Sequence, residues 1–399
     1  MRAIIEKLVE GLFKFCGSIS IMVMLLITVF LFKEGMGLFK SPVVESGYVL
    51  CLHPSNSIER LSSFQIKEIF DYEIENWRDV GGNDIEVRLF RFEEIFNHYS
   101  DEDFGDNYEL LPEKLADEIF ADPGIIAFIP KAYVLEESEK LKVLDAGAIS
   151  LSSFFTGREW MPTATPAAQF GALPLITGTL WISFFAILIA LPLGLGVAIY
   201  MSELAGERIR KMMKPAIELL AGIPSIVYGF FGLIVLAPLI QKTFDLPVGE
   251  TAFTGSLILA IMALPTIITV AEDAIRSAPL SMREASLSLG ANQWQTIYRV
   301  VIPYAASGIS AAVILGIGRA VGETMAVLMV TGNAAVMPTS IFEPIRTIPA
   351  TIAAELGEAP SGGTHYKALF LLGCILFIIT LAMSVVAEMM SKKQHSKGI

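Results

Sequence analysis

The chain has 399 residues, of which 53% are hydrophobic and 18% charged, with a formal net charge of −12 and a mean hydropathy of +0.59. A soluble globular domain carries about 25% charged residues, so this composition excludes an ordinary soluble enzyme or binding domain and indicates a membrane protein. The charge is divided unevenly, since residues 34–172 hold 26 acidic and 11 basic side chains.

Six uncharged runs follow one another along the chain, and each has 18 residues or more. About 20 apolar residues cross a hydrocarbon core of about 30 Å, so the sequence predicts six membrane-spanning helices. The runs are 15–32, 160–202, 219–241, 251–271, 300–318 and 368–387. The first is longer than the apolar region of a signal peptide and lacks a small-residue cleavage site. It is therefore predicted to be a retained anchor helix, within residues 1–36.

Lysine and arginine residues of short loops gather on the cytoplasmic side of a membrane protein. Four segments hold them here: Arg2, Lys7 and Lys14; Arg208, Arg210, Lys211 and Lys214; Arg276, Arg283 and Arg299; Lys392, Lys393 and Lys397. These segments alternate correctly only if both termini are cytoplasmic. Residues 34–170, 242–252 and 329–366 are then expected outside.

The acidic stretch after the first span is predicted to be a small α+β domain, residues 41–160, inserted between the first and second spanning helices. Apolar or alternating residues predict strands at 47–53, 85–92 and 125–129, and helices at 62–70 and 112–120.

Chemical motifs of enzymes are missing from the sequence. Cys16, Cys51 and Cys374 have no paired spacing, so no disulfide framework is expected. The four histidines do not have metal-ligand spacing. No catalytic residues, metal or cofactor are therefore predicted. No phosphate-binding loop of the G-x-x-x-x-G-K-[ST] type occurs either, so another subunit must bind ATP if ATP drives this protein.

The predicted cytoplasmic loop 273–302 holds the most informative motif. Glu284-Ala285-Ser286 is followed by Gly290 and then by Val300-Val301-Ile302-Pro303. This resembles the E-A-A-x(3)-G-x(9)-h-x-h-P signature of ABC importer permeases, with Ser286 in place of the second alanine. The resemblance implies a helical segment that seats in a groove of an ATPase and couples it to transport. The alternative is an amphipathic connector on the membrane surface.

The physical properties of the loop suit a docking segment. Leu287, Leu289 and Trp294 give a short helix an apolar face, and Gly290 permits a left-handed backbone turn between two helices. Pro303 is expected to begin the next spanning helix, where its missing N–H does no harm. The residues expected to form the coupling site are Glu284, Ala285, Leu287, Gly290, Ala291 and Pro303.

Other words resemble the phosphate branch of this permease family. They are IPSIVYGFFG at 223–232, AEDAIR at 271–276 and GRAVGETMAV at 318–327. The continuation MAVLMVTGN at 325–333 is more similar to PstC-type than to PstA-type permeases. The resemblance covers residues 170–390 and implies a type I ABC importer permease domain, here 170–392, that conducts inorganic phosphate.

Arg319 and Glu323 are ionisable residues within a predicted span, which makes them functional candidates. Because four residues separate them, they are predicted to share one helix face. One interpretation is an internal salt bridge that makes both charges tolerable. The other is a substrate pathway, in which the guanidinium donates to a phosphate oxygen and the carboxylate holds it in place. The pathway candidates are Arg319, Glu323 and Thr324.

The inserted domain also resembles part of a phosphate-binding protein. The similar words are LSSFQIKEIF at 61–70, NWRDVGG at 76–82 and DPGIIAF at 122–128. In that family, an arginine is followed by Gly, Ser and Thr residues that supply anion ligands. Here Arg91 is followed by Phe92, Glu93 and Glu94, so a degenerate half-domain used for docking or packing is favoured over a phosphate receptor.

The resemblance as a whole implies an all-α membrane permease without enzymatic activity. Its implied partners are a second, PstA-like permease, two PstB-like ATPases, an extracytoplasmic phosphate-binding protein and membrane lipid, with no nucleic acid. Two alternatives are a permease for molybdate or sulfate and a membrane-anchored phosphate sensor.

Overall fold

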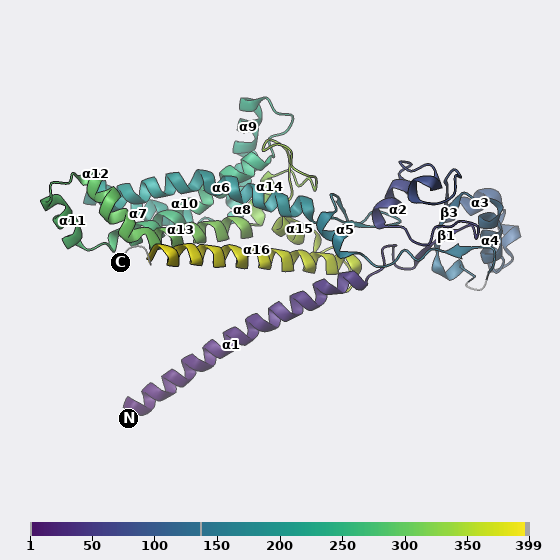
Figure 1. The fold of residues 1–399 in the computed structure, drawn as a ribbon, viewed down its shortest axis with the longest axis horizontal. Coiled ribbons are helices and arrows are strands. Elements are labelled where there is room, and N and C mark those ends of the chain that lie inside the picture. Colours follow the sequence, from purple (N-terminus) through teal and green to yellow (C-terminus); the bar gives the residue numbers. More distant parts are fainter. Residues whose placement is uncertain (1, 136–137, 396–399) are drawn as a thin grey trace. The chain divides into compact units, whose positions relative to one another are not determined.

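The computed structural model describes residues 2–135 and 138–395 and divides into two compact units (Figure 1). The membrane unit comprises Met1–Gly35, Leu173–Ser361 and Leu369–Ile399, and the acidic unit comprises Met36–Ala172 and Gly362–Ala368. Lys397, one of the basic residues of the C-terminal tail, lies outside the described residues.

Six helical segments of the described chain are long and apolar enough to cross a membrane, which confirms the predicted number. They are Glu10–Lys40, Leu173–Leu204, Ser225–Phe244, Ala252–Arg276, Gln293–Gly322 and Thr364–Val386. The helices that build them are α1 (Arg2–Met36), α6 (Leu173–Ile199), α8 (Ser225–Phe231), α9 (Ala237–Phe244), α10 (Ala252–Arg276), α12 (Gln293–Thr296), α13 (Ile302–Gly322) and α16 (Thr364–His395). Three segments include π-helical turns, at Tyr200–Leu204, Gly232–Leu236 and Ile297–Val301.

Two spans begin later than the sequence predicted. The span predicted over 160–202 is wrong in its first part, because these residues form a hairpin of β5 (Trp160–Met161) and β6 (Gln169–Phe170). Proline both removes a helical hydrogen bond and restricts the residue before it, and Pro162 and Pro166 lie between these strands. The span predicted over 219–241 is also wrong at its start. Its first residues belong to the end of α7 (Glu207–Ala221), and the span begins after Pro224.

The membrane unit is built around α10, which packs against α6 and α13. Its most apolar stretch is 61% buried within the chain. Small buried residues recur every four positions on α6, at Ala186, Ala190, Gly194 and Ala198. They let the two backbones approach closely: a Cβ added at Gly194 would lie 2.7 Å from a methyl group of Ile267. This stripe explains why α6 and α10 run side by side in Figure 1.

The acidic unit contains a four-stranded mixed sheet in the order β2-β3-β1-β4. The strands are β1 (Tyr48–Leu52), β2 (Arg88–Arg91), β3 (Ile125–Pro130) and β4 (Lys142–Val143). β3 pairs parallel with β2 and antiparallel with β1. The sheet confirms the strands predicted at 47–53, 85–92 and 125–129, although β2 is shorter than its prediction.

Helices close the core of the acidic unit. They are α2 (Ser63–Phe70), α3 (Ile95–His98), α4 (Leu111–Ala121) and α5 (Leu151–Thr156). α2 and α4 confirm the two predicted helices. Ser62 and Gln65 form a capping box at the start of α2, which satisfies backbone donors that a helix N-terminus leaves unpaired. The indole nitrogen of the buried Trp77 donates to the carbonyl of Gly124 at 2.9 Å.

Candidate functional site

The loop that resembles a coupling motif forms two short helices at one end of the membrane unit (Figure 1). α11 (Leu280–Ser288) and α12 are joined by a turn around Gly290, whose φ is +83°. An L side chain is strained at that φ, so the expectation of a left-handed glycine between two helices is confirmed. We refer to residues 273–302 as the coupling loop.

Local hydrogen bonds fix the angle between the two helices of the coupling loop. Asn292 caps α12 by accepting from the amide of Gln295 at 2.9 Å, and Gln295 accepts from the amide of Asn292. The hydroxyl groups of Ser286 and Thr296 lie 2.9 Å apart and link α11 to α12. Ser286, the departure from the family signature, therefore makes a contact that alanine could not make.

Large apolar side chains on the coupling loop are exposed to solvent. Leu289 is 89% exposed, and Leu280, Leu287 and Trp294 are also exposed. Beside them lies a groove of ≈ 580 Å³ whose lining includes Ala285, Gly290 and Ala291. An apolar face of this kind, next to a groove, is typical of a surface that a partner protein covers.

Glu284 and Pro303 complete the residues predicted for the coupling site. Glu284 lies on α11 and is exposed. Pro303 is the second residue of α13, but the helical segment already begins at Gln293. Pro303 therefore does not begin the span as expected. The π-helical turn Ile297–Val301 directly precedes it, and such a turn relaxes the hydrogen-bond ladder that proline interrupts.

Arg319 lies in the last turn of α13 and is partly buried. A cation at this place is favoured by the partial negative charge of the helix C-terminus. Its Nε atom is buried and has no hydrogen-bond partner among the described residues. The guanidinium also lies within electrostatic range of Tyr228 on α8. Arg319 thus keeps donor capacity inside a span, where an unused donor is costly.

Glu323 does not share a helix face with Arg319, which corrects the predicted spacing. α13 ends at Gly322, and Glu323 has extended backbone angles. Its Oε1 accepts from the amide of Ala326, at 3.3 Å, in the first turn of α14 (Met325–Val330). No ion pair joins Glu323 to Arg319 in the described chain. The carboxylate thus satisfies one free amide at the start of the next helix, and the predicted internal salt bridge is wrong.

Thr324 occupies a separate place from Arg319. With Gly322 it lines a groove of ≈ 490 Å³, together with residues of α16 and of α15 (Ile348–Glu355). The Thr324 hydroxyl donates to the carbonyl of Gly322 at 3.2 Å. The three pathway candidates are therefore neighbours in the chain, while Arg319 does not line the groove that Thr324 lines.

Two of the segments whose sequences resemble ABC permeases, residues 223–232 and 325–333, pack against each other. Gly229 of α8 faces α14, where an added Cβ would lie 3.0 Å from the Cα of Ala326. An added Cβ at Gly232 would come within 2.7 Å of Val330. Glycine is therefore required at both positions for the close approach of the two segments, which packs residues 223–232 against the segment that follows Arg319.

A partly buried ion pair, between Arg346 and Glu355, was missed by the sequence analysis. The Nη1 of Arg346 lies 2.6 Å from Glu355 Oε1, and their side chains are 19% and 14% exposed. The pair brackets α15, whose first amide, that of Ile348, donates to the Thr179 hydroxyl at 2.9 Å. An Arg and a Glu at the two ends of the short apolar run 347–354 were the available signal.

The segment before α15 is held by hydrogen bonds outside the spans. Glu343 accepts from the hydroxyl and the amide of Thr339 and from the amide of Ser340. These bonds hold the pKa of Glu343 below its usual value, the Thr339 hydroxyl making the largest contribution. The backbone of the same segment accepts from Ala252 and Phe253 at the start of α10, so this outer segment is fixed to the central helix.

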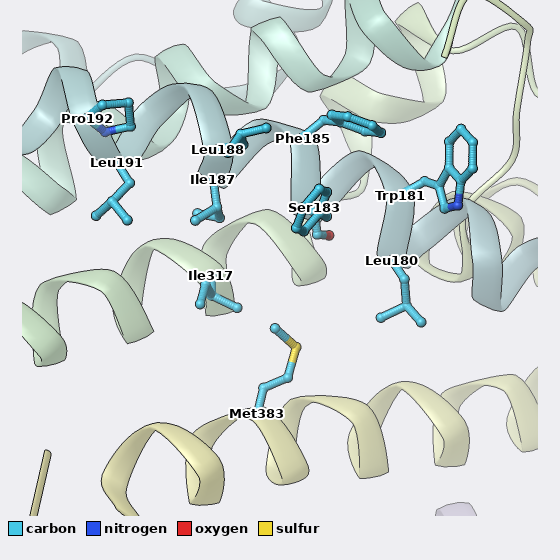
Figure 2. A pocket seen from close by; sticks show the side chains of 11 residues that line it. Leu180, Trp181, Ser183, Phe185, Ile187, Leu188, Leu191, Pro192, Ile317 and Met383 are labelled. Atoms are coloured by element: carbon cyan, nitrogen blue, oxygen red, sulfur yellow. The ribbon is translucent and has the colours of Figure 1, made fainter. Parts of the chain in front are cut away.

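A pocket of ≈ 990 Å³ between α6, α13 and α16 is almost entirely apolar (Figure 2). Leu180 and Leu191 of α6 line it with Ile317 of α13 and Met383 of α16. The hydroxyl of Ser183, also in its lining, already donates to the Thr179 carbonyl at 2.7 Å. A pocket with this lining suits hydrocarbon and offers no charged group to stabilise an anion.

Comparison with known proteins agrees with the architecture. Residues 190–395 match the family described as "Binding-protein-dependent transport system inner membrane component". The chain is 43% identical over 257 residues to the phosphate transport system permease protein PstC of Mesorhizobium japonicum, covering 60% of this chain and 77% of that protein. It is 39% identical over 264 residues to PstC of Pasteurella multocida, covering 61% and 81%.

Among solved structures, the inward-facing MetNI methionine ABC transporter is similar over 55% of this chain and 96% of that chain, with 17% identity and a TM-score of 0.44. The family match extends over more than half of the present chain, and the two PstC proteins exceed 30% identity over most of their own length. The chain therefore belongs to the family of binding-protein-dependent transport system inner membrane components and is a multi-pass ABC importer permease of the PstC type.

Proposed function

We propose that this permease forms a transmembrane pathway for inorganic phosphate in an ATP-driven importer. The observation that carries the substrate is the similarity to PstC proteins, at 43% identity over 257 residues for one of them. A polar feature of the membrane unit agrees with an anionic substrate, because Arg319 keeps a buried, unpartnered Nε within a span.

Arg319 is proposed as the residue that receives phosphate in the pathway. Its planar guanidinium stays charged in almost any environment and matches the geometry of phosphate oxygens. Glu323 takes a different part from the one that its spacing suggested. By accepting from the Ala326 amide, it fixes the turn between α13 and α14 and so holds the end of α13 that carries Arg319. The Thr324 hydroxyl is proposed to face the aqueous pathway from the same turn.

The family to which the chain belongs supports a proposal about its partners. We propose a complex with a second, PstA-like permease, two PstB-like ATPases and an extracytoplasmic phosphate-binding protein. The chain itself then hydrolyses no ATP. The coupling loop binds an ATPase, through its exposed apolar residues and the groove beside Gly290. We therefore also propose that the coupling loop and both termini lie in the cytoplasm.

The direct test is phosphate uptake by proteoliposomes that hold the permease with its candidate partners. We expect ATP-dependent uptake of radiolabelled phosphate that unlabelled phosphate inhibits and equimolar sulfate or molybdate does not. Arg319→Gln should lower uptake at least tenfold, since a hydrogen bond to a charged group contributes about 1.5–3 kcal/mol. Arg208→Gln is the matched control, because Arg208 is exposed at the start of α7.

The two alternatives predict other outcomes. A permease for another oxyanion would show uptake of sulfate or molybdate with phosphate as the weaker competitor. A membrane-anchored sensor would show no uptake, and its coupling loop would have no ATPase to bind. Normal phosphate uptake by the Arg319→Gln variant would remove Arg319 from the pathway while leaving the transporter assignment in place.

A further inference from the structure

The end of α6 is held by both helices of the coupling loop. Glu203 lies in the π-helical turn that ends the second span. Its carboxylate Oε1 is 2.7 Å from Nη2 of Arg283 on α11. Its backbone carbonyl accepts from Nε2 of Gln293 on α12 at 3.1 Å. The coupling loop thus contacts a residue 80 or more positions away in the chain through both of its helices.

Arg283 also binds the end of α10. Its Nη1 donates to the carbonyl of Ala278 at 2.6 Å and its Nη2 donates to the carbonyl of Ile275 at 3.1 Å. The last carbonyls of a helix have no partner within the helix and carry partial negative charge. One guanidinium therefore joins three elements: α11, which carries it, the C-terminus of α10, and the end of α6.

The Glu203–Arg283 pair is largely shielded from water, as is the pair of Arg210 and Glu272 at the same end of the membrane unit. The side chains of Glu203 and Arg283 are 9% and 19% exposed. By contrast, Glu207 and Lys211 on α7 form a pair of 2.8 Å with side chains that are 80% and 75% exposed. Exposed pairs contribute little, whereas a charge-assisted hydrogen bond shielded from water is stronger. The structure thus supplies an exposed control pair that begins four residues further along the chain.

The chain connects the coupling loop covalently to α10 and α13, but not to α6. We propose that Glu203 and Arg283 form a clamp that carries the movement of the coupling loop to α6, so that α6, α10 and α13 move together when the ATPase moves. The clamp rests on the proposed function of the coupling loop. Neither residue contacts substrate, and both act as positioning residues in the transmission of force.

The clamp makes a prediction about coupling rather than about binding. In the Glu203→Ala variant, the amount of phosphate moved per hydrolysed ATP should be about tenfold lower than in the wild type. This factor corresponds to the loss of one hydrogen bond to a charged group. Glu207→Gln, which breaks the exposed pair on α7, should leave this ratio unchanged. The measurement is phosphate uptake and ATP hydrolysis in the same proteoliposomes, normalised to assembled complex.

A chemical linker separates force transmission from simple stability. In a Cys16→Ser background, Glu203→Cys combined with Arg283→Cys should be uncoupled when reduced. A bifunctional thiol reagent of about the length of the ion pair should restore the ratio of phosphate moved to ATP hydrolysed. The two single-cysteine variants, treated in the same way, should gain nothing. Restoration by a covalent link is not expected if the pair only stabilises the fold.

The outcomes distinguish failure of the proposed function from failure of the clamp. A wild-type complex that moves no phosphate would overturn the proposed function. If the wild type imports phosphate and Glu203→Ala keeps its full ratio of uptake to hydrolysis, the clamp alone is wrong. Failure of the linker to restore coupling in the double-cysteine variant would also overturn the clamp. If Glu203→Ala does not assemble, the linker experiment decides.

Discussion

At the scale of single residues, Glu323 shows how a contact with the backbone changes the role that sequence spacing predicts for a charged side chain. The carboxylate caps the first turn of α14, so its oxygen is used by a backbone amide and not by Arg319. Capping side chains of this kind contribute about 0.5–2 kcal/mol to a helix. Arg319 is left without this partner, and its buried Nε has no hydrogen-bond partner among the described residues.

We therefore predict that the acceptor atom of Glu323 matters more than its negative charge. Glu323→Gln keeps an oxygen that accepts from Ala326, and we expect uptake within about twofold of the wild type. Glu323→Ala removes the acceptor, and we expect several-fold lower uptake because the start of α14 is destabilised by about 1 kcal/mol. Uptake by both variants at equal membrane level is the measurement. If Gln and Ala are equally inactive, the carboxylate charge itself is required.

The double variant Arg319→Gln, Glu323→Gln completes this comparison. Recovery of transport in such a variant is the result expected of a buried ion pair, because both charges vanish together. The structure has no such pair, so we expect the double variant to stay as inactive as Arg319→Gln alone.

At the scale of an element, the coupling loop depends on one backbone conformation. The φ of +83° at Gly290 turns the chain from α11 into α12, and the bond between Ser286 and Thr296 sets how these two helices meet. An added Cβ at Gly290 would meet nothing within 4 Å. The demand for glycine is therefore conformational and not steric.

We predict that Gly290→Pro abolishes coupled transport while the protein remains in the membrane. Proline fixes φ near −65°, which is incompatible with the turn. Gly290→Ala should have a weaker effect, since the left-handed conformation costs about 1–2 kcal/mol. Gly206→Ala is the matched control, because Gly206 has a φ of −65° and open space around it.

Phosphate uptake and the amount of co-purified ATPase test this prediction. We expect both to fall in Gly290→Pro and both to be unchanged in Gly206→Ala. The same assay with Glu284→Lys, an exposed position of α11, tests whether the charge of the motif is required. Full uptake with normal ATPase association in Gly290→Pro and Glu284→Lys would exclude this loop as the docking segment.

At the scale of the whole molecule, the acidic unit has its own core and a chemistry that opposes anion binding. Its buried cluster includes Phe90, Leu115 and Ile129. At the end of β2, the amide of Arg91 donates to the Glu94 carboxylate at 3.2 Å. This backbone donor is thus already bonded to a negative group, and Glu93 adds a second negative charge.

We predict that the acidic unit does not bind phosphate with micromolar affinity. Two carboxylates beside Arg91 repel an anion, and their positions lack the neutral donors that a phosphate site needs. Calorimetry on a fragment of residues 36–172 is the measurement, with the extracytoplasmic binding protein as the positive control. Saturable micromolar binding by the fragment would show that the unit is a receptor rather than a docking or packing domain.

The sequence alone determined the number of spans, three strands of the acidic unit and the place of Gly290. Each is a local property, set by the length of an apolar run, by alternation or by one backbone angle. The starts of two spans near Pro162 and Pro224 could also have been predicted from these prolines. They were missed because an apolar run continues across each proline.

Only the tertiary structure decided which charges meet. The sequence spacing paired Arg319 with Glu323, but α13 ends between them, and Glu323 instead accepts from the first turn of α14, which packs against α8 at Gly229. Glu203 and Arg283 are 80 residues apart in the chain. Their contact arises from the packing of helices that are distant in the sequence, and no local pattern of residues encodes it.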